Sequence, residues 1–242
     1  KELRDIPSLS ATSNLSSSFA IGLISSKQAI NHVLRSLPDE IGTGQFAWIT
    51  EIIWREFYKY ITYHFPHVSK GKSFNPKYDH ISWRDDEASF LKWCEGKTGV
   101  PIIDAAMRQL NETKWMHNRL RMITAMFLTK NLLVDWRKGE RYFMENLIDG
   151  DFCSNNGGWQ WSASTGVDAS PYFRIFNPIT QSEKFDPDGK FIKKFVPELI
   201  DCPTNEIHNP SIETRSSLNY PEMIVDLKSS RLRAIDAFKS IK

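Results

Sequence analysis

Residues 155–161 read NNGGWQW, inside the longer run LIDGDFCSNNGGWQWSASTGVDASPYF at 147–173. Two tryptophans, Trp159 and Trp161, follow two glycines, two asparagines and a pair of aspartates. Such a stretch can bring backbone and indole rings close to a flat molecule, although paired tryptophans more often serve packing. The segment from Asp149 to Pro178 is rich in Gly, Asn, Ser and aromatic residues and is predicted as a loop. A loop of that length is usually functional or wrongly assigned.

The rest of the chain has an ordinary globular composition. Of its 242 residues, 40% are hydrophobic and 25% are charged, with no apolar run of transmembrane length. The start, KELRDIPSLS, lacks the apolar core of a signal peptide. Cys94, Cys153 and Cys202 are odd in number and far apart, which argues against a disulfide framework and a CxxC metal site. We therefore expect a cytoplasmic monomer with no metal site and no membrane partner.

Most segments are predicted as helices, and no alternating strand of convincing length is found. Apolar residues recur at three- and four-residue spacing over 45–65, and Pro66 ends that run. Ser25 and Gln28 suit a capping box for a helix that reaches Leu37. The fold class is therefore all-α, and we expect the whole chain, 1–242, to form one helical domain. Further helices are predicted at 86–95, 101–110, 116–134, 137–148 and 230–241.

Three other patterns have an ordinary interpretation. GTGQFA at 42–47 matches a dinucleotide fingerprint but has no strand before it, so we read it as the start of a helix. His64 and His67 have no partner cluster and are interpreted as surface histidines. Seven basic and two acidic residues over 113–142 give a local charge of +5. That charge suits a polyanion, although a solvated helix pair explains it as well.

Four short motifs need a joint explanation. TSNLS at 12–16 offers hydroxyls and backbone donors for phosphate oxygens. DGD at 149–151 offers two acceptors around a glycine, suited to ribose hydroxyls or ring NH groups. NRLRM at 118–122 places amide, guanidinium and thioether groups on one helical face. Each is ordinary alone, but together with NNGGWQW they indicate a pocket for a planar, phosphate-bearing cofactor beside a planar, anionic substrate.

Longer blocks then point to a family. They are ITEIIWREFY (49–58), EGKTGVPIIDAAMRQLNETKWMHNRLRMITAMFL (95–128), DWRKGERYFMENLIDGDFCSNNGGWQWSASTGVDASPYFRIFNP (135–178) and EKFDPDGKFIKKFVPEL (183–199). These blocks resemble the flavin-binding domain of the DNA photolyase and cryptochrome family, most of all its class I cyclobutane pyrimidine dimer photolyases. The resemblance covers about residues 1–200 and leaves 201–242 as a C-terminal tail with a last helix. The family's N-terminal α/β domain, which holds an antenna chromophore, is absent, so an excised domain is expected.

The resemblance implies an all-helical domain that binds FAD in a bent, U-shaped conformation. The 12–16 loop would hold the diphosphate, and Arg121 would pair with Asp149 near the flavin ring. Asn155 corresponds to the residue facing flavin N5, where a neutral amide favours the fully reduced flavin. The family commonly has Arg where this chain has Asn14, which removes one cationic partner of the diphosphate. The predicted cofactor-binding residues are Thr12, Ser13, Asn14, Leu15, Ser16, Arg121, Asp149, Gly150, Asp151 and Asn155.

The resemblance also implies damaged DNA as the partner, with the pyrimidine dimer flipped into the site. Glu51 would share a proton with a dimer carbonyl, which requires burial to raise its pKa. Trp54 and Trp161 would form the walls of the dimer pocket, while Asn118 would bond a pyrimidine edge and Met122 would pack against it. The predicted DNA-binding residues are Arg4, Glu51, Trp54, Tyr58, Asn118, Arg119, Trp161, Arg174 and Gln181.

Three tryptophans, Trp83, Trp136 and Trp159, match the family's chain that relays an electron from the surface to photoexcited flavin. The implied activity is that of a deoxyribodipyrimidine photo-lyase. Reduced FAD absorbs blue light, passes an electron to the dimer and takes it back after the ring opens. Two alternatives remain: a cryptochrome-type blue-light receptor without repair activity, and a helical DNA-binding module without a cofactor. The second alternative leaves the DGD motif and the tryptophans without a role.

Overall fold

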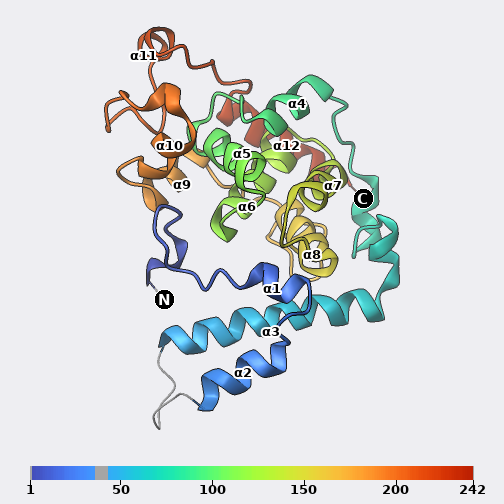
Figure 1. Cartoon of the computed structure of the whole chain (residues 1–242). Coiled ribbons are helices and arrows are strands. Elements are labelled where there is room, and N and C mark those ends of the chain that lie inside the picture. The colour runs from blue at the N-terminus through green and yellow to red at the C-terminus, as the bar shows by residue number, and fades with distance from the viewer. Residues whose placement is uncertain (1, 36–42, 242) are drawn as a thin grey trace.

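The computed structural model describes residues 2–35 and 43–241, and within these ranges every regular element is a helix (Figure 1). The predicted all-α fold is therefore confirmed. The α-helices are α1 (Ser16–Ala20), α2 (Ser26–Arg35), α3 (Thr43–His64), α4 (Glu87–Glu95), α5 (Pro101–Thr113), α6 (Asn118–Met126), α7 (Trp136–Asn146), α8 (Phe152–Ala163), α9 (Pro178–Phe185), α10 (Lys190–Phe195), α11 (Ile212–Ser217) and α12 (Leu227–Lys239). Short turns of helix are η1 (Glu2–Asp5), η2 (Pro66–Lys70), η3 (Pro76–His80), η4 (Phe127–Asn131, a π-helical turn) and η5 (Pro197–Leu199).

Several helix ends lie where capping chemistry predicts them. The Ser25 hydroxyl accepts a hydrogen bond from the Gln28 backbone N–H at 3.1 Å, and Gln28 Oε1 accepts from the Ser25 N–H at 3.0 Å, which completes the predicted capping box. The predicted end of α2 at Leu37 lies outside the described residues. Helix α3 continues to His64, and Pro66 opens η2, as expected from the sequence. The helix predicted over 116–134 is instead α6 followed by the π turn η4.

The prediction of a loop over 149–178 was wrong, because NNGGWQW lies inside helix α8. The Asp151 side chain caps the helix by accepting a hydrogen bond from the Ser154 N–H at 2.9 Å, and Ser164 ends it in a left-handed conformation. Two glycines in a helix interior cost about 1 kcal/mol each relative to alanine. Tertiary packing of α8 overrides this propensity, because most helical stability in proteins comes from packing.

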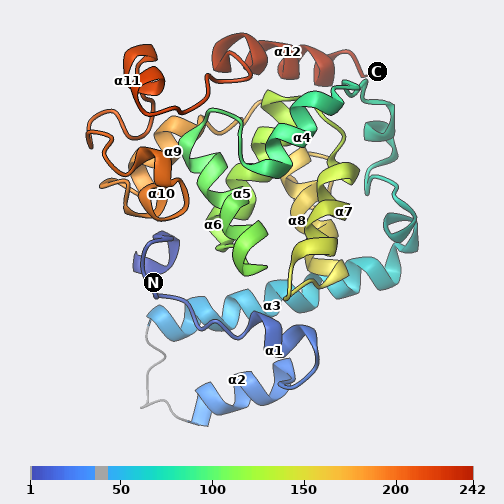
Figure 2. The same ribbon diagram turned by 45° about the horizontal axis from the view of Figure 1, so that its top comes forward.

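Helix α8 is central to the bundle and packs against α3, α6 and α7 (Figure 2). Its glycines allow close approach on one side. A Cβ atom at Gly157 would lie 2.1 Å from the Tyr58 ring of α3. On the α7 side, a Cβ atom at Gly139 would lie 2.2 Å from the Trp159 ring. The sequence of α8 thus suits a helix whose neighbours press directly on its backbone.

Helix α3 crosses the end of the bundle, and α2 lies on its far side in both views (Figures 1 and 2). A small apolar cluster of Phe19, Ala29 and Ile52 joins α1, α2 and α3 apart from the main core. This arrangement positions the 12–15 segment, which leads into α1, near the junction of α3 with the bundle.

The C-terminal tail is tied to the main core by buried polar contacts. The Tyr220 hydroxyl donates to the buried carboxylate of Asp104 at 2.6 Å, and Arg215 Nη1 donates to the Gly99 carbonyl at 2.8 Å. Helix α12 lies on the π turn η4, where Asn131 Nδ2 donates to the Ser230 hydroxyl at 3.0 Å. The tail therefore has a structural role in holding α5 and η4.

Candidate functional site

Arg121 and Asp149 form a half-buried ion pair, as predicted. Arg121 Nη2 lies 2.9 and 2.7 Å from the two carboxylate oxygens of Asp149, and its Nε donates to the Met116 carbonyl at 2.8 Å. The Asp149 side chain is almost completely buried, whereas the Arg121 side chain retains 26% of its exposure. The pair therefore fixes the turn between α7 and α8 against α6 and leaves one edge of the guanidinium accessible.

Asp151, the second acid of the DGD motif, has two partners of its own. Besides capping α8, its Oδ2 lies 3.2 Å from Arg55 Nη2. The same Arg55 nitrogen donates to the Phe19 carbonyl at the end of α1 at 3.1 Å. Arg55 thus connects the 12–20 segment, α3 and the start of α8, so it is a residue of the candidate cofactor site that the sequence reasoning missed.

The orientation of the Asn155 amide is fixed by the backbone. Its Nδ2 donates to the Glu140 carbonyl at 2.9 Å, and because a carbonyl only accepts, the amide group cannot be reversed. Oδ1 is then left without a hydrogen-bond donor among the described residues. Burial raises the pKa of the Glu140 carboxyl, although the Asn156 amide donates to it at 2.9 Å. Because Asn155 Oδ1 has no donor within the described part of the chain, a polar group bound next to it would meet a hydrogen-bond acceptor.

Gly158 differs from its neighbour Gly157, because a Cβ atom added there would meet nothing within 4 Å. Gly158 lies three residues after Asn155 on α8, so both belong to one side of the helix. The free acceptor and the missing side chain therefore face the same open side of α8. A planar group can approach the helix backbone there without steric hindrance.

The predicted phosphate-binding loop over 12–16 runs directly into α1. Asn14 takes a left-handed backbone conformation, with φ of 53°, and its side chain accepts a hydrogen bond from the Thr12 hydroxyl at 3.1 Å. Ser16 begins α1 after Leu15. The Ser16 hydroxyl accepts from the indole nitrogen of Trp115 at 3.3 Å, so Trp115 anchors this loop to the turn between α5 and α6. Ser13 is exposed, as a phosphate-binding residue must be.

On α3, Glu51 and Trp54 are exposed on the face predicted to receive DNA. Trp54 keeps 40% of its surface accessible and contacts the Phe57 ring edge-on at 5.3 Å. Tyr58, one turn further, packs against Gly157 and is half-buried. Burial, with a contribution from the negative charge of Asp168, raises the pKa of Tyr58 to about 12. Its ring therefore serves the α3–α8 contact in this structure.

The short helix η1 joins α3 to α6 through two ion pairs. Arg4 Nη1 lies 2.6 Å from Glu51 Oε1, and Asp5 Oδ2 lies 3.0 Å from Arg119 Nη2. The burial that we expected for Glu51 is not present, since its side chain is 51% exposed. The reason is geometric: no element covers this face of α3 apart from Arg4 among the described residues. Burial of Glu51 would require a ligand.

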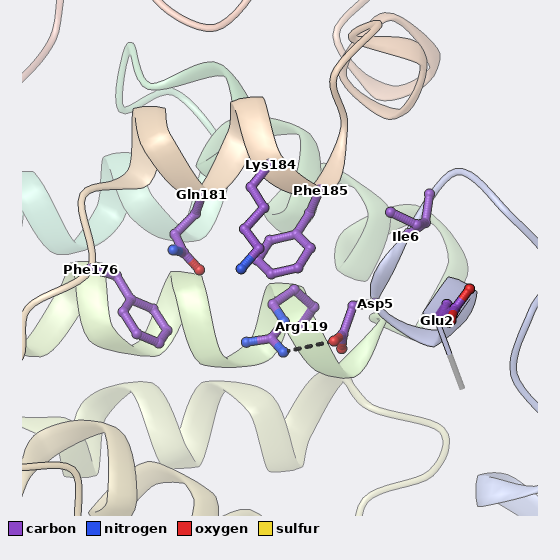
Figure 3. Close-up of a pocket in the computed structure, with 8 residues that line it drawn as sticks. All are labelled: Glu2, Asp5, Ile6, Arg119, Phe176, Gln181, Lys184 and Phe185. Atoms are coloured by element: carbon purple, nitrogen blue, oxygen red, sulfur yellow. Dashed lines mark ion pairs between the residues drawn. The ribbon is translucent and has the colours of Figure 1, made fainter. Parts of the chain in front are cut away.

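Other predicted DNA-binding residues lie on α6, on α9 and in the loop before α9. On α6, Asn118 Nδ2 lies 3.9 Å from the sulfur of Met122, as expected for neighbours one turn apart. Figure 3 shows Gln181 of α9 and Arg119 of α6 on opposite sides of one cavity. Arg174 is exposed in the loop before α9. The structure thus brings residues from four separate segments to one face.

The two tryptophans of α8, Trp159 and Trp161, have distinct surroundings. Trp159 is buried, with Phe143 at 5.0 Å and Trp93 at 6.0 Å between ring centroids. Trp161 is half-buried and lies 6.5 Å from Phe176, on the other side of α8. The two tryptophans of NNGGWQW therefore have different neighbours. Sequence reasoning did not identify Trp93, whose ring packs edge-on against the ring of Trp159.

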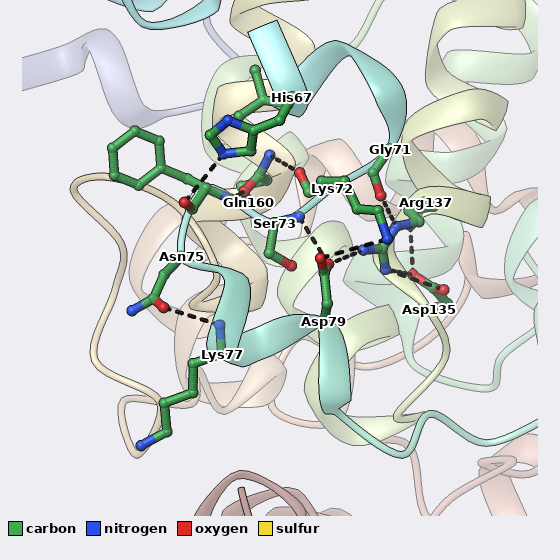
Figure 4. A network of polar contacts seen from close by, with 12 residues as sticks. His67, Gly71, Lys72, Ser73, Asn75, Lys77, Asp79, Asp135, Arg137 and Gln160 are labelled. Carbon is green, nitrogen blue, oxygen red and sulfur yellow. Dashed lines mark hydrogen bonds and ion pairs between the residues drawn. The ribbon is translucent and has the colours of Figure 1, made fainter. Parts of the chain in front are cut away.

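Trp136 is completely buried and lies under an arginine. The Arg137 guanidinium carbon is 4.7 Å from the Trp136 ring centroid, within cation–π range. Arg137 is held there by Asp79 at 2.7 Å and Asp135 at 3.1 Å and by the Gly71 carbonyl (Figure 4). Partial burial opposes ionisation of Asp79, but hydrogen bonds from Ser73 and the charge of Arg137 hold its pKa below the usual value.

Trp83 is half-buried and lies 6.2 Å from the Phe238 ring of α12. The indole nitrogens of Trp83 and Trp136 are both buried and have no hydrogen-bond partner among the described residues. An oxidised indole at either position would therefore have no protein base within hydrogen-bond reach. The Arg137 cation over the Trp136 ring is itself paired with the carboxylates of Asp79 and Asp135.

The residues present fit a dinucleotide-like cofactor with a planar ring system. The 12–16 loop offers donors, Arg121 offers a positive edge, and the open side of α8 offers an acceptor beside a glycine. No cluster of three metal-ligating side chains occurs in the described part of the chain. Among the same residues, no helix is long and apolar enough to cross a membrane.

Comparison with known proteins decides the family. The model of a family described as the FAD binding domain of DNA photolyase matches residues 48–240. The chain belongs to this family. The match extends past Leu199, where the recognised blocks end, and includes α12. FAD is accordingly the cofactor that the site of this photolyase domain is built to hold.

Relatives in sequence and structure agree with this assignment. The protein of Escherichia coli (strain K12) named deoxyribodipyrimidine photo-lyase is 51% identical over 247 residues, covering 100% of this chain and 52% of that protein. A Neurospora crassa protein of the same name is 51% identical over 259 residues, covering 98% and 42%. The chain spans about half the length of the curated relatives it matches.

Solved structures are similarly close. A bacterial class III photolyase from Agrobacterium tumefaciens superposes with a TM-score of 0.92 at 44% identity, covering 99% of this chain and 52% of that chain. A Synechocystis cryptochrome superposes with a TM-score of 0.86 at 31% identity, covering 98% and 51%. The helical fold is therefore shared by proteins named photolyase and by one named cryptochrome, and the residues of the site must separate the two.

Proposed function

We propose that this chain carries the catalytic site for light-driven repair of cyclobutane pyrimidine dimers in DNA. The observation that carries the proposal is the junction at η1. Arg4 contacts Glu51 of α3 and the adjacent Asp5 contacts Arg119 of α6, so the predicted substrate residues of both helices meet at one place. Arg121, two residues after Arg119, belongs to the candidate cofactor site. Asn118, a predicted substrate residue, lies three residues before Arg121 and so shares its face of α6.

FAD, when bound, supplies absorption of blue light and one-electron transfer. The 12–16 loop and Arg55 would orient its phosphates, since both lie at the junction of α1, α3 and α8. Asn155 Oδ1 would accept a hydrogen bond from a protonated ring nitrogen N5, because its Nδ2 is engaged by the Glu140 carbonyl. An amide holds such a proton without removing it, which favours the reduced flavin that repair requires.

The substrate side would select a flipped dimer. Trp54 and Trp161 would stack on the pyrimidines, at about 1–3 kcal/mol per base, while extrusion of a damaged pair costs only a few kcal/mol. Asn118 would bond a pyrimidine edge. Glu51 would lose its solvent exposure beneath the dimer, and burial favours the neutral carboxyl that donates to a carbonyl. Arg4, Arg119 and Arg174 would contact the strand through its phosphates.

The buried tryptophans would serve reduction of the flavin and not cleavage of the dimer. Trp159 would give up an electron first, Trp136 would then reduce Trp159, and Trp83 would in turn reduce Trp136. Trp136 is completely buried, so a positive charge on its indole would lie away from solvent, which is unfavourable. This supports rapid onward transfer to Trp83, whose surroundings are partly open to solvent. A class I enzyme acting as a monomer in the cytoplasm, with an antenna chromophore on a separate domain, completes the proposal.

The test is repair itself. The purified chain is loaded with FAD, reduced chemically and illuminated with blue light together with dimer-containing oligothymidylate. We expect thymine absorbance to recover in the light and not in the dark. A flavin-loaded chain that absorbs light but restores no thymine would instead favour a cryptochrome-type receptor. A chain that binds the oligonucleotide but no FAD would favour a DNA-binding module.

A further inference from the structure

The helix η1 contacts the DNA-binding face with two ion pairs of opposite sense. In the first pair, η1 supplies the cation: Arg4 binds the carboxylate of Glu51 at 2.6 Å. In the second, η1 supplies the anion: Asp5 binds the guanidinium of Arg119 at 3.0 Å. Two groups that DNA must engage are thus already occupied by adjacent residues of the chain itself.

The cavity beside Asp5 is lined by the cations Arg119 and Lys184 and by the acids Glu2 and Asp5. A cavity of about 460 Å³ lies between η1 and α9. Figure 3 shows the Lys184 and Gln181 side chains extending from α9 toward Arg119, with the Asp5 carboxylate paired to it. Arg119 is held in place by the Phe185 ring, 4.5 Å below its guanidinium carbon. Asp5 therefore pairs with Arg119 and shares its cavity with a second cation, Lys184, and with the Gln181 amide.

We propose that Asp5 is a built-in competitor of the DNA backbone, occupying Arg119 in place of a phosphate until DNA displaces it. The inference rests on the proposed function, since it concerns the same DNA-binding face. A carboxylate and a phosphate both present oxygen atoms to the guanidinium fork, so one replaces the other at the same nitrogen atoms. Asp5 therefore limits how tightly DNA binds, whether or not the DNA is damaged.

The exchange is feasible because the competing pair is partly solvated. The side chains of Arg119 and Asp5 retain 18% and 30% of their exposure, so water can take over the carboxylate once phosphate arrives. Arg4 lies next to Asp5 and is 44% exposed. A phosphate that moves η1 away from Arg119 also draws Arg4 from Glu51. Glu51 is then released for the dimer at the moment DNA binds.

The alternative is that the Asp5–Arg119 pair only fastens the N-terminal segment to α6. The two explanations predict opposite changes in DNA binding for Asp5→Asn. A competitor that is removed gives tighter binding. A fastener that is removed gives looser positioning of Arg119 and weaker or unchanged binding. Glu183→Gln is the control for net charge. It removes one negative charge from an exposed residue of α9, as Asp5→Asn removes one from η1.

The experiment measures binding of the chain to fluorescently labelled oligothymidylate, with and without a dimer, over a range of salt concentrations. For Asp5→Asn we expect about two- to fivefold tighter binding of both oligonucleotides, the range that one partly exposed ion pair supports. We also expect the slope of log K against log salt to steepen by roughly 0.7, as for one further phosphate contact to a single strand. Circular dichroism confirms that each variant is folded.

Glu183→Gln should change affinity less than Asp5→Asn does. Binding by Asp5→Asn that equals or falls below that of the wild type overturns the inference, as does an equal gain in Glu183→Gln. The wild-type chain separates this failure from that of the proposed function. If it shows no preference for the dimer-containing strand, the proposed function fails, whereas the comparison of Asp5→Asn with the wild type still decides the inference.

Discussion

The two glycines of NNGGWQW provide a sharp prediction, because they face different surroundings on one helix. At Gly157 an alanine Cβ would lie 2.1 Å from the Tyr58 ring, which is itself confined between Trp54 and Phe57. Such overpacking costs about 1–3 kcal/mol, offset by roughly 1 kcal/mol of helix propensity. At Gly158 a Cβ meets nothing within 4 Å. Gly158→Ala should therefore gain up to about 1 kcal/mol from propensity alone.

The assay is thermal unfolding of the flavin-free chain followed by circular dichroism. The two variants should then differ by about 1–3 kcal/mol, the overpacking cost alone, which corresponds to roughly 2–12 °C for a chain of this size. We expect the order of midpoints to be Gly158→Ala, wild type, Gly157→Ala. A Gly157→Ala chain as stable as Gly158→Ala would refute the close packing of α8 on α3. FAD content after purification adds a second comparison, since Gly158 lies on the open side of α8 beside Asn155.

Two further predictions concern ionisable groups around the same helix. Arg121→Gln leaves the buried Asp149 carboxylate without its partner, so unfolding should become easier by about 3–5 kcal/mol and bound FAD should be lost, as thermal unfolding and the flavin spectrum will show. Glu140→Gln keeps the acceptor for Asn156 but does not titrate. Because burial raises the folded-state pKa of Glu140 above its unfolded value, its contribution to stability is complete at low pH and is lost as pH rises through the folded pKa. In denaturant titrations, the free energy of unfolding of Glu140→Gln should equal that of the wild type at a pH below the unfolded pKa of Glu140 and should exceed it at pH 8. A difference that does not change with pH would contradict the raised pKa of Glu140.

Helices with regular apolar spacing and conventional caps could be predicted from sequence. The 45–65 segment and the Ser25–Gln28 box are examples, since each rests on contacts within a few residues. Helix α8 could not be predicted in this way. Its glycines and asparagines disfavour a helix locally, and the compensating contacts with α3 and α7 come from residues distant in sequence. Local propensity fails where tertiary packing decides.

The same difference between local patterns and long-range contacts separates the site residues that were predicted from those that were missed. Residues in long family blocks, such as Arg121 and Asp149, were predicted and pair as expected. Asp5 and Arg137 were missed, because an ion pair across more than fifty residues leaves no periodic signal in one sequence. Glu51 was expected to be buried, but the fold alone leaves its side chain half exposed. Sequence patterns therefore identify the residues of a site more readily than their contacts and exposure in the absence of a ligand.

The central claim is that neighbouring residues of α8 serve different partners, Asn155 and Trp159 the flavin and Trp161 the DNA lesion, so that light drives repair. The most direct measurement is dimer repair under blue light by FAD-loaded, chemically reduced wild-type, Trp159→Phe and Trp161→Phe chains. We predict repair by Trp159→Phe close to that of the wild type, with photoreduction of oxidised flavin abolished. For Trp161→Phe we predict dimer binding weakened about five- to thirtyfold, the loss of 1–2 kcal/mol of stacking. Loss of repair in chemically reduced Trp159→Phe, or unchanged dimer binding in Trp161→Phe, would contradict the account.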